Sequence, residues 1–200
     1  MTITAGDIAA LRARTGMGIM DCKKALEETN GNAEQAIENL RKSGAIKAAK
    51  RAGKIAAEGL VLSYIHGMGK IGVLVEVNCE TDFVGKTDAF RALVNDVAMQ
   101  IAGANPKYVS REEVPADELE KEKALYREQL KAEGKPENIV EKILEGKLGR
   151  YYSEVCLLDQ PFIKDEDKTV TQLLAEKTGE IGEKITVRRF TRYELGEGLE

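Results

Sequence analysis

Few residues in the sequence could catalyse a reaction, and none of them stands beside a suitable partner. The single histidine, His66, ends a β-rich run beside a glycine turn, with no serine or cysteine nucleophile motif in range. Because a catalytic triad needs such partners, we interpret His66 as a strand-end residue. The three cysteines, Cys22, Cys79 and Cys156, are far apart and lack both C-x-x-C and zinc spacing. We expect them to be reduced structural thiols.

Motifs that bind nucleotides or metals are also missing. Neither G-x-x-x-x-G-K-[ST] nor G-x-G-x-x-G occurs, so the chain is not expected to bind a nucleotide itself. The acidic residues of 165–167 resemble a calcium loop only faintly, because Val170 stands where that loop needs glycine. We interpret 164–168 as a solvated acidic turn. The sequence therefore predicts no cofactor, no metal site and no enzymatic activity.

Two stretches are harder to explain by structure alone. The run NCETDFVG at 78–85 carries an apolar strand into a polar turn that contains Phe83. The ring either packs under the helix expected to start after Thr87 or faces a partner, and the pattern favours neither. The second stretch, 41–54, holds six basic residues and no acidic one. It is either a solvated linker or a strip for an acidic partner surface; nucleic acid is less favoured because no aromatic residues are interleaved.

Three short helices are predicted in the first fifty residues, each with one apolar stripe. Thr4 and Asn32 are typical N-caps, and the glycines of Thr15-Gly16 and Asn30-Gly31 are typical of helix ends. The third helix is expected to extend to Gly44. The Ala- and Lys-rich residues 43–57 then read as a linker with helical tendency. We therefore predict two domains: a three-helix domain with its basic linker at 1–52, and a core at 53–200.

The core is predicted to be of the α+β class. Residues 60–66 and 70–78 alternate with a period of two and form a hairpin, with Ile71, Val73, Val75 and Val77 on one face. A helix capped by Thr87 should cover that face. Two antiparallel helices are expected at 115–133 and 136–155, followed by a helix ending at Gly179 and a strand over 184–193. Strands and helices are segregated instead of alternating, which favours α+β.

The overall composition limits the possible partners. The chain has 200 residues and a net charge of −4, which argues against general binding of nucleic acid. No stretch approaches the roughly 18 to 20 apolar residues that span a bilayer, and no signal segment opens the chain. The sequence predicts a cytoplasmic protein that contacts neither membrane nor nucleic acid directly.

Two longer motifs resemble a known family. RARTGMGIMDCKKAL at 12–26, followed by NLRKSG at 39–44, is similar to the amino-terminal signature of the bacterial translation elongation factor Ts family. EVNCETDFV at 76–84 resembles the second signature of that family, and FTRYELGEG at 190–198 resembles its end. The likeness covers nearly the whole chain, and its two long motifs are independent and in the right order.

The resemblance implies a guanine nucleotide exchange factor for elongation factor Tu, with a UBA-like three-helix head and an α+β core. It implies that the head grips the GTPase through partner-binding residues, and that the TDFV turn disturbs the Mg²⁺ and phosphate site to release GDP. Elongation factor Tu would be bound both with GDP and free of nucleotide. The matching positions are Arg12, Ile19, Met20, Lys23 and Arg51 for binding, and Thr81, Asp82, Phe83 and Val84 for dislocation of Mg²⁺.

Long members of the family carry a doubled core and a coiled-coil insertion, whereas this chain has one core unit, like the short members. We therefore expect a homodimer, in which two copies supply what a long form has in one. The resemblance leaves open which surface the basic stretch 41–54 and Phe162 would contact.

Two alternatives stay open from the residues alone. The head could be a UBA module that binds ubiquitin-like partners, since Met17-Gly18-Ile19 is similar to the loop of such modules, although Ile19 replaces the usual aromatic residue. A hydrolase with unrecognised carboxylates is the second alternative, and the lack of a nucleophile and a base disfavours it.

Overall fold

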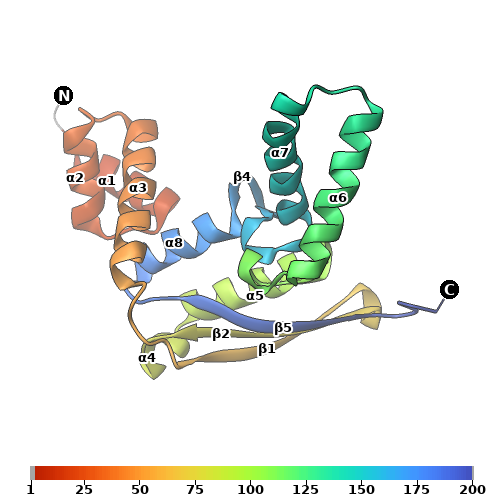
Figure 1. The fold of residues 1–200 in the computed structure, drawn as a ribbon. Coiled ribbons are helices and arrows are strands. Elements are labelled where there is room, and N and C mark those ends of the chain that lie inside the picture. The colour runs from red at the N-terminus through yellow and green to blue at the C-terminus, as the bar shows by residue number, and fades with distance from the viewer. Residues whose placement is uncertain (1–2, 200) are drawn as a thin grey trace. The chain divides into compact units, whose positions relative to one another are not determined.

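The computed structural model describes residues 3–199, without the side chain of Asn138. It confirms the predicted α+β class. The elements in chain order are shown in Figure 1 and are α1 (Ala5–Thr15), α2 (Ile19–Glu28), α3 (Ala33–Arg51), β1 (Glu58–His66), β2 (Ile71–Cys79), α4 (Asp82–Gly85), α5 (Asp88–Ala104), α6 (Ala116–Ala132), α7 (Glu137–Val155), β3 (Pro161–Phe162), β4 (Asp165–Thr169), α8 (Val170–Ile181) and β5 (Thr186–Glu194).

The chain divides into two compact units, and each is assembled from several stretches. The first contains the described residues up to Leu60, together with Val77–Leu93 and Gln172–Thr186. The second contains Val61–Glu76, Val94–Thr171 and the described residues from Val187 onward. The N-terminal helices and the turn that holds Phe83 therefore belong to the same unit. The predicted boundary after residue 52 stays a prediction.

The N-terminal helices form where their caps predict. Thr4 caps α1 in a reciprocal capping box with Asp7, and the side chain of Asn32 accepts from two amides of the first turn of α3. Gly16 follows α1 in the left-handed conformation, with φ of 67°. The three helices close a small apolar core made of Leu11, Met17, Cys22, Ala25, Leu26, Ala36 and Leu40.

The predicted end of the third helix at Gly44 is wrong. Helix α3 continues without a break to Arg51, because Ala and Lys are good helix formers and Gly44 is a packing position instead of a cap. Gly44 is buried against α8, where a Cβ on Gly179 would lie only 3.0 Å from the Cα of Gly44. Two small residues thus let the backbones of α3 and α8 approach closely.

Many basic side chains of the stretch 41–54 are paired with acidic side chains of the same chain. Four of its six basic side chains form ion pairs with acidic residues of the chain itself, and most of the stretch is helical, so it is not a solvated linker. Contact of this stretch with an acidic partner surface stays a prediction. The pairs and their N–O distances are Arg41–Glu176 at 3.1 Å, Lys42–Glu38 at 2.7 Å, Lys47–Asp21 at 2.9 Å and Arg51–Glu80 at 2.7 Å.

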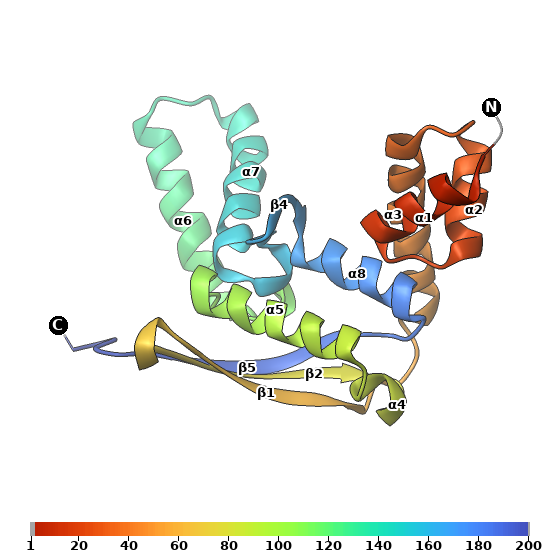
Figure 2. The ribbon, with the colours of Figure 1, turned by 180° about the vertical axis from the view of Figure 1, so that it is seen from behind.

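Strands β1, β2 and β5 form an antiparallel sheet in the order β1-β2-β5. The predicted alternation is confirmed in β2, where Val73, Val75 and Val77 are buried and Leu74 is exposed. Helix α5 is capped by Thr87, whose hydroxyl accepts from the amide of Phe90 at 3.2 Å. Figure 2 shows α5 lying along the sheet, and its stripe of Phe90, Leu93, Val94, Val97 and Ile101 is buried.

The remaining elements follow the sequence in part. The predicted pair of helices is confirmed as α6 and α7, which contact each other. The predicted acidic turn at 164–168 is wrong, because Asp165–Thr169 forms β4 and pairs with β3. Helix α8 does not end at Gly179 but continues to Ile181 and is followed by Gly182. Phe162 is 4% exposed, which excludes it as a surface contact.

Candidate functional site

The candidate site is the turn that follows β2, where residues Asp82–Gly85 form the single helical turn α4. The ring of Phe83 is 80% exposed. The alternative in which it packs under the following helix is therefore wrong. Exposing a large aromatic ring forgoes roughly 1.5 to 3 kcal/mol of burial, so a turn that holds it outward must be stabilised by other contacts.

Two contacts between residues close in sequence and one contact with Gly59 shape this turn. Thr81 stands at its N-cap, where its hydroxyl accepts from the amide of Val84 at 3.5 Å. The thiol of Cys79 donates to the carbonyl of Thr81 at 3.1 Å, and burial raises the pKa of this thiol, so it stays protonated at neutral pH. Gly85 is buried against the backbone of Gly59, where a Cβ would lie 3.2 Å from a carbonyl oxygen. A Cβ at this position would therefore make a tight contact with the backbone of Gly59.

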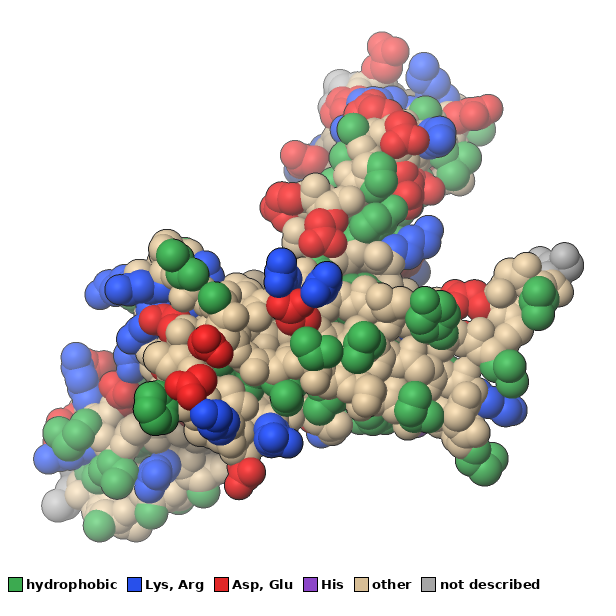
Figure 3. Space-filling model, turned by 90° about the horizontal axis from the view of Figure 1, so that it is seen from below, with side chains coloured by type: hydrophobic (Ala, Val, Ile, Leu, Met, Phe, Trp, Pro, Cys, Tyr) green, Lys and Arg blue, Asp and Glu red, His purple; other side chains and the backbone are tan. Residues whose placement is uncertain are grey.

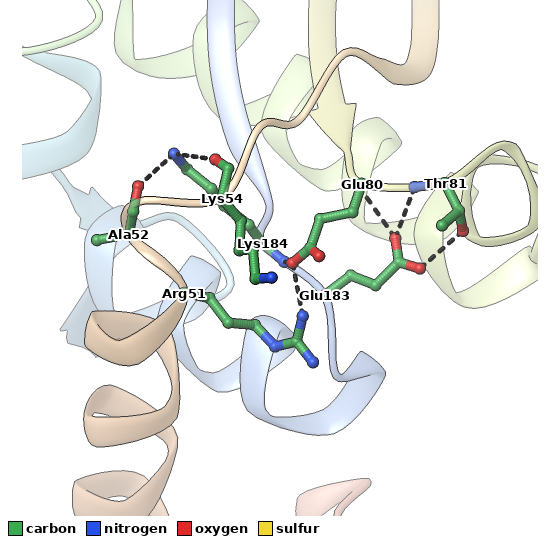
Figure 4. Close-up of polar contacts among 7 residues, drawn as sticks. All are labelled: Arg51, Ala52, Lys54, Glu80, Thr81, Glu183 and Lys184. Carbon is green, nitrogen blue, oxygen red and sulfur yellow. Dashed lines mark hydrogen bonds and ion pairs between the residues drawn. The ribbon is translucent and has the colours of Figure 1, made fainter.

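Residues distant in sequence hold the base of the turn (Figure 4). One carboxylate oxygen of Glu183 accepts from the amides of Glu80 and Thr81, both at 3.0 Å, and the other accepts from the Thr81 hydroxyl at 2.7 Å. The carboxylate of Glu80 accepts from the amide of Lys184 at 2.6 Å and from Arg51 at 2.7 Å. These bonds lower the pKa of Glu80, the amide of Lys184 being the main cause, so it is ionised at neutral pH.

The electrostatics of the turn are dominated by Asp82. Its carboxylate accepts from the ammonium of Lys86 at 2.6 Å, and this hydrogen bond lowers the pKa of Asp82 and raises the pKa of Lys86. Both groups are charged at neutral pH and remain exposed to solvent. The turn therefore presents one anionic oxygen donor beside one apolar ring.

The head residues singled out from the sequence are also at the surface. Ile19 and Met20, on the first turn of α2, are 55% and 73% exposed, although large apolar side chains are normally buried. Arg12 and Lys23 are exposed on α1 and α2. Met17 of the same loop is buried in the core of the head. The loop thus keeps one apolar side chain inside and presents two outside.

Arg51 lies apart from the other predicted binding residues. It is the last residue of α3, and its guanidinium is half-buried against Glu80 at the base of the turn. Glu183 and Lys184 hold the same base and belong to none of the motifs recognised in the sequence. Glu183 is 103 residues from Glu80, and no local pattern marks a long-range pair of this kind.

The histidine and the cysteines form no recognisable catalytic or metal site among the described residues. His66 is exposed and its Nδ1 lies 3.0 Å from the hydroxyl of Tyr64. Cys22, Cys79 and Cys156 are free and buried. Within residues 3–199, no three His, Cys, Asp or Glu side chains are grouped so that they could hold a metal ion. No helix in the same range is long and apolar enough to cross a membrane.

Fold and site together define an α+β protein with an N-terminal three-helix bundle and an aromatic side chain presented on a short turn. The sequence profile described as Elongation factor TS matches residues 7–197. Similar proteins, each named Elongation factor Ts, come from Moorella thermoacetica (62% identical, covering 98% of this chain and 97% of the relative), Desulforamulus reducens (63%, 99% and 91%) and Geobacter sulfurreducens (60%, 100% and 93%).

The chain belongs to the elongation factor Ts family. This identification confirms the resemblance of the two signature motifs. It places the chain among the elongation factors of protein biosynthesis.

Proposed function

We propose that the chain is a guanine nucleotide exchange factor for elongation factor Tu, which binds the GDP complex, promotes GDP release and leaves a nucleotide-free complex that GTP can reload. The observation that carries the proposal is the 80% exposed ring of Phe83 on a turn held from beneath. A ring presented in this way in a member of this family is suited to enter a partner. The protein would act in the cytoplasm during elongation.

Release follows from thermodynamic linkage. If the bound exchange factor weakens the affinity for GDP by some factor, GDP weakens the affinity for the exchange factor by the same factor. The Thr81–Val84 turn would act beside the Mg²⁺ and phosphate site of the partner. Mg²⁺ bridges phosphate oxygens to the GTPase, so displacing it removes a large electrostatic contribution to GDP binding.

Asp82 and Phe83 would contribute in different ways. The ionised carboxylate of Asp82 favours Mg²⁺ as an oxygen donor and disfavours the phosphates as an anion. Seating Phe83 in a gap of the partner would contribute roughly 1.5 to 3 kcal/mol, about ten- to a hundredfold in affinity. A complete shift between two states needs about 5.5 kcal/mol of differential binding. The turn alone is therefore insufficient.

The head would supply the remaining binding energy through Ile19 and Met20, with Arg12 and Lys23 beside them on α1 and α2. Two exposed apolar side chains on a rigid helix are typical of a protein contact. Arg51 would contribute by holding Glu80 at the base of the turn. In this arrangement the head determines affinity, and the turn determines the rate of release.

The test measures release of a fluorescent GDP analogue from elongation factor Tu as the concentration of this protein is varied. The wild type should accelerate release. Phe83→Ala should lower the maximal rate about tenfold or more with a small change in half-saturating concentration, since one buried ring is worth this much. Met20→Asp should raise the half-saturating concentration instead. Unaccelerated release by the wild type would refute the exchange function, and an unchanged rate with Phe83→Ala would refute the role of the ring.

Point variants are preferable to removal of the head. A chain without residues 1–52 would lose Arg51 from Glu80 and expose the glycine surface of α8, so it would disturb the turn as well as the head.

We also propose that two copies of the chain associate through the outer face of the sheet. Val61, Ile65 and Leu74 are each more than half exposed on this face, and Figure 3 shows hydrophobic side chains spread along it. A shallow hollow of about 270 Å³ lies beside them, lined in part by Glu76 and Arg189. Apolar side chains next to a complementary ion pair suit a self-complementary contact.

Sedimentation equilibrium tests this association. The wild type should sediment with twice the chain mass, and Leu74→Asp should sediment as a monomer, because a buried charge would have no partner. Leu125→Asp, at an exposed apolar position on α6, is the matched control and should leave the mass unchanged. A monomeric wild type at all concentrations would refute the dimer.

A further inference from the structure

We infer that Glu183 is a positioning residue for nucleotide exchange: it holds the Thr81–Gly85 turn in the conformation that presents Phe83. Glu183 lies in the segment between α8 and β5, and none of the sequence motifs includes it. The inference rests on the proposed function for its effect on exchange. Its structural part, that Glu183 holds the turn, stands on contacts within the first compact unit.

The carboxylate of Glu183 accepts an unusually dense set of hydrogen bonds. Glu183 takes three hydrogen bonds from two consecutive residues, namely the amides of Glu80 and Thr81 and the hydroxyl of Thr81, at 2.7–3.0 Å. Hydrogen bonds to an ionised acceptor are about twice as strong as neutral ones. The two amides lie immediately before α4, and without Glu183 both would lose this acceptor.

The hydroxyl of Thr81 connects Glu183 to the turn. This hydroxyl donates its proton to Glu183 at 2.7 Å, so a lone pair is directed toward the amide of Val84, from which it accepts at 3.5 Å. Glu183 therefore selects the side-chain rotamer in which Thr81 caps α4. Phe83 lies within that one turn, and its orientation depends on the cap.

Residues 80–81 and residues 183–184 bond to each other in both directions. Glu183 accepts from the backbone of Glu80, while Glu80 accepts from the backbone of Lys184 at 2.6 Å. The ammonium of Lys184 donates to the carbonyls of Ala52 and Lys54, which follow α3, and Arg51 donates to Glu80. Figure 4 shows these contacts, from the carbonyls of Ala52 and Lys54 on one side to Thr81 on the other. The end of α3, the end of β2 and the segment before β5 are thus joined at the base of the turn.

The geometry distinguishes a positioning role from general stabilisation. Glu183 contacts only residues 80 and 81 among the bonds above, and the ring of Phe83 is presented two residues further on. Substitution of Glu183 should therefore lower the contribution of Phe83 to the rate of GDP release. It should do nothing further when Phe83 is absent.

The experiment compares Glu183→Ala, Phe83→Ala and the double variant with the wild type in GDP release from elongation factor Tu. Glu183→Ala should lower the maximal rate about five- to tenfold and change the half-saturating concentration less than about twofold. In the Phe83→Ala background it should have no further effect, since two residues acting through one ring are not additive. Glu145→Ala, which removes an exposed carboxylate from α7, is the matched control. Equal slowing by Glu183→Ala with and without Phe83 would overturn the inference.

A second readout does not depend on the partner. In Glu183→Ala, hydrogen exchange at the amides of Glu80 and Thr81 should accelerate about tenfold or more, while the amide of Val97 in α5 should be unchanged. Glu183→Gln keeps one carbonyl acceptor and should restore part of the protection. Unchanged exchange at both amides would overturn the positioning role. If the wild type does not accelerate GDP release from elongation factor Tu, the proposed function is refuted. Hydrogen exchange at the amides of Glu80 and Thr81 would still show whether Glu183 holds the turn.

Discussion

The head and the Phe83 turn both expose large apolar side chains, but they hold them by different means. Ile19 and Met20 stand on a bundle that has its own apolar core, so packing keeps them in place. Phe83 stands on four helical residues that directly follow Glu80 and Thr81. The amides of Glu80 and Thr81 donate to Glu183, and the carboxylate of Glu80 accepts from Arg51. Exposed apolar side chains are thus held by an apolar core in the head and by a few polar contacts at the Phe83 turn.

The largest expected effect is on the core of the head. Leu26→Ala should lower the free energy of unfolding by about 2–5 kcal/mol, because Leu26 is 2% exposed and its removal leaves a cavity. Denaturation by urea measures the change. Ile46→Ala, at a 57% exposed position on α3, should stay within about 0.5 kcal/mol. A comparable loss from both variants would show that the head is not held by its core.

An intermediate effect is expected where α3 meets α8. Gly179→Ala should cost about 1–3 kcal/mol, since its Cβ would lie 3.0 Å from the backbone of Gly44. The measurement is again the free energy of unfolding. Gly146→Ala on α7 has no atom within 4 Å of the added Cβ and should stabilise the chain by up to about 1 kcal/mol. A stabilising Gly179→Ala would contradict the close packing of these helices.

The smallest effect concerns pH and the polar contacts of the turn. The folded pKa of Glu80 lies below its ordinary value of 4.5, so its contribution to stability is present above that pH and is lost as the pH falls through the folded pKa. Thermal unfolding should show the wild type more stable than Glu80→Gln near neutral pH, with the difference shrinking at acidic pH. A difference independent of pH would mean that the charge of Glu80 contributes nothing.

The same contrast explains what the sequence could predict. The caps, apolar stripes and core of the head were predictable because the residues that form them lie close to one another in sequence. The predicted face of β2 and the stripe of α5 were confirmed for the same reason, as period and burial follow local patterns.

The errors all have a tertiary cause. Gly44 was interpreted as a helix end because a buried glycine between two helices has the same sequence signature as a C-cap. The acidic residues 165–167 read as a solvated turn in the sequence, yet backbone pairing with β3 makes a short strand there, although Asp and Glu are depleted in strands. The base of the Phe83 turn is bonded to Glu183, which is 103 residues away from Glu80 and which no local pattern indicates.

The unbroken course of α3 has a mechanical consequence. A helix of 19 residues is about 28 Å long and resists bending over that length. Helix α3 begins in the head, where Asn32 caps it, and it ends at Arg51, which forms an ion pair with Glu80. One continuous helix therefore connects the head with the base of the aromatic turn.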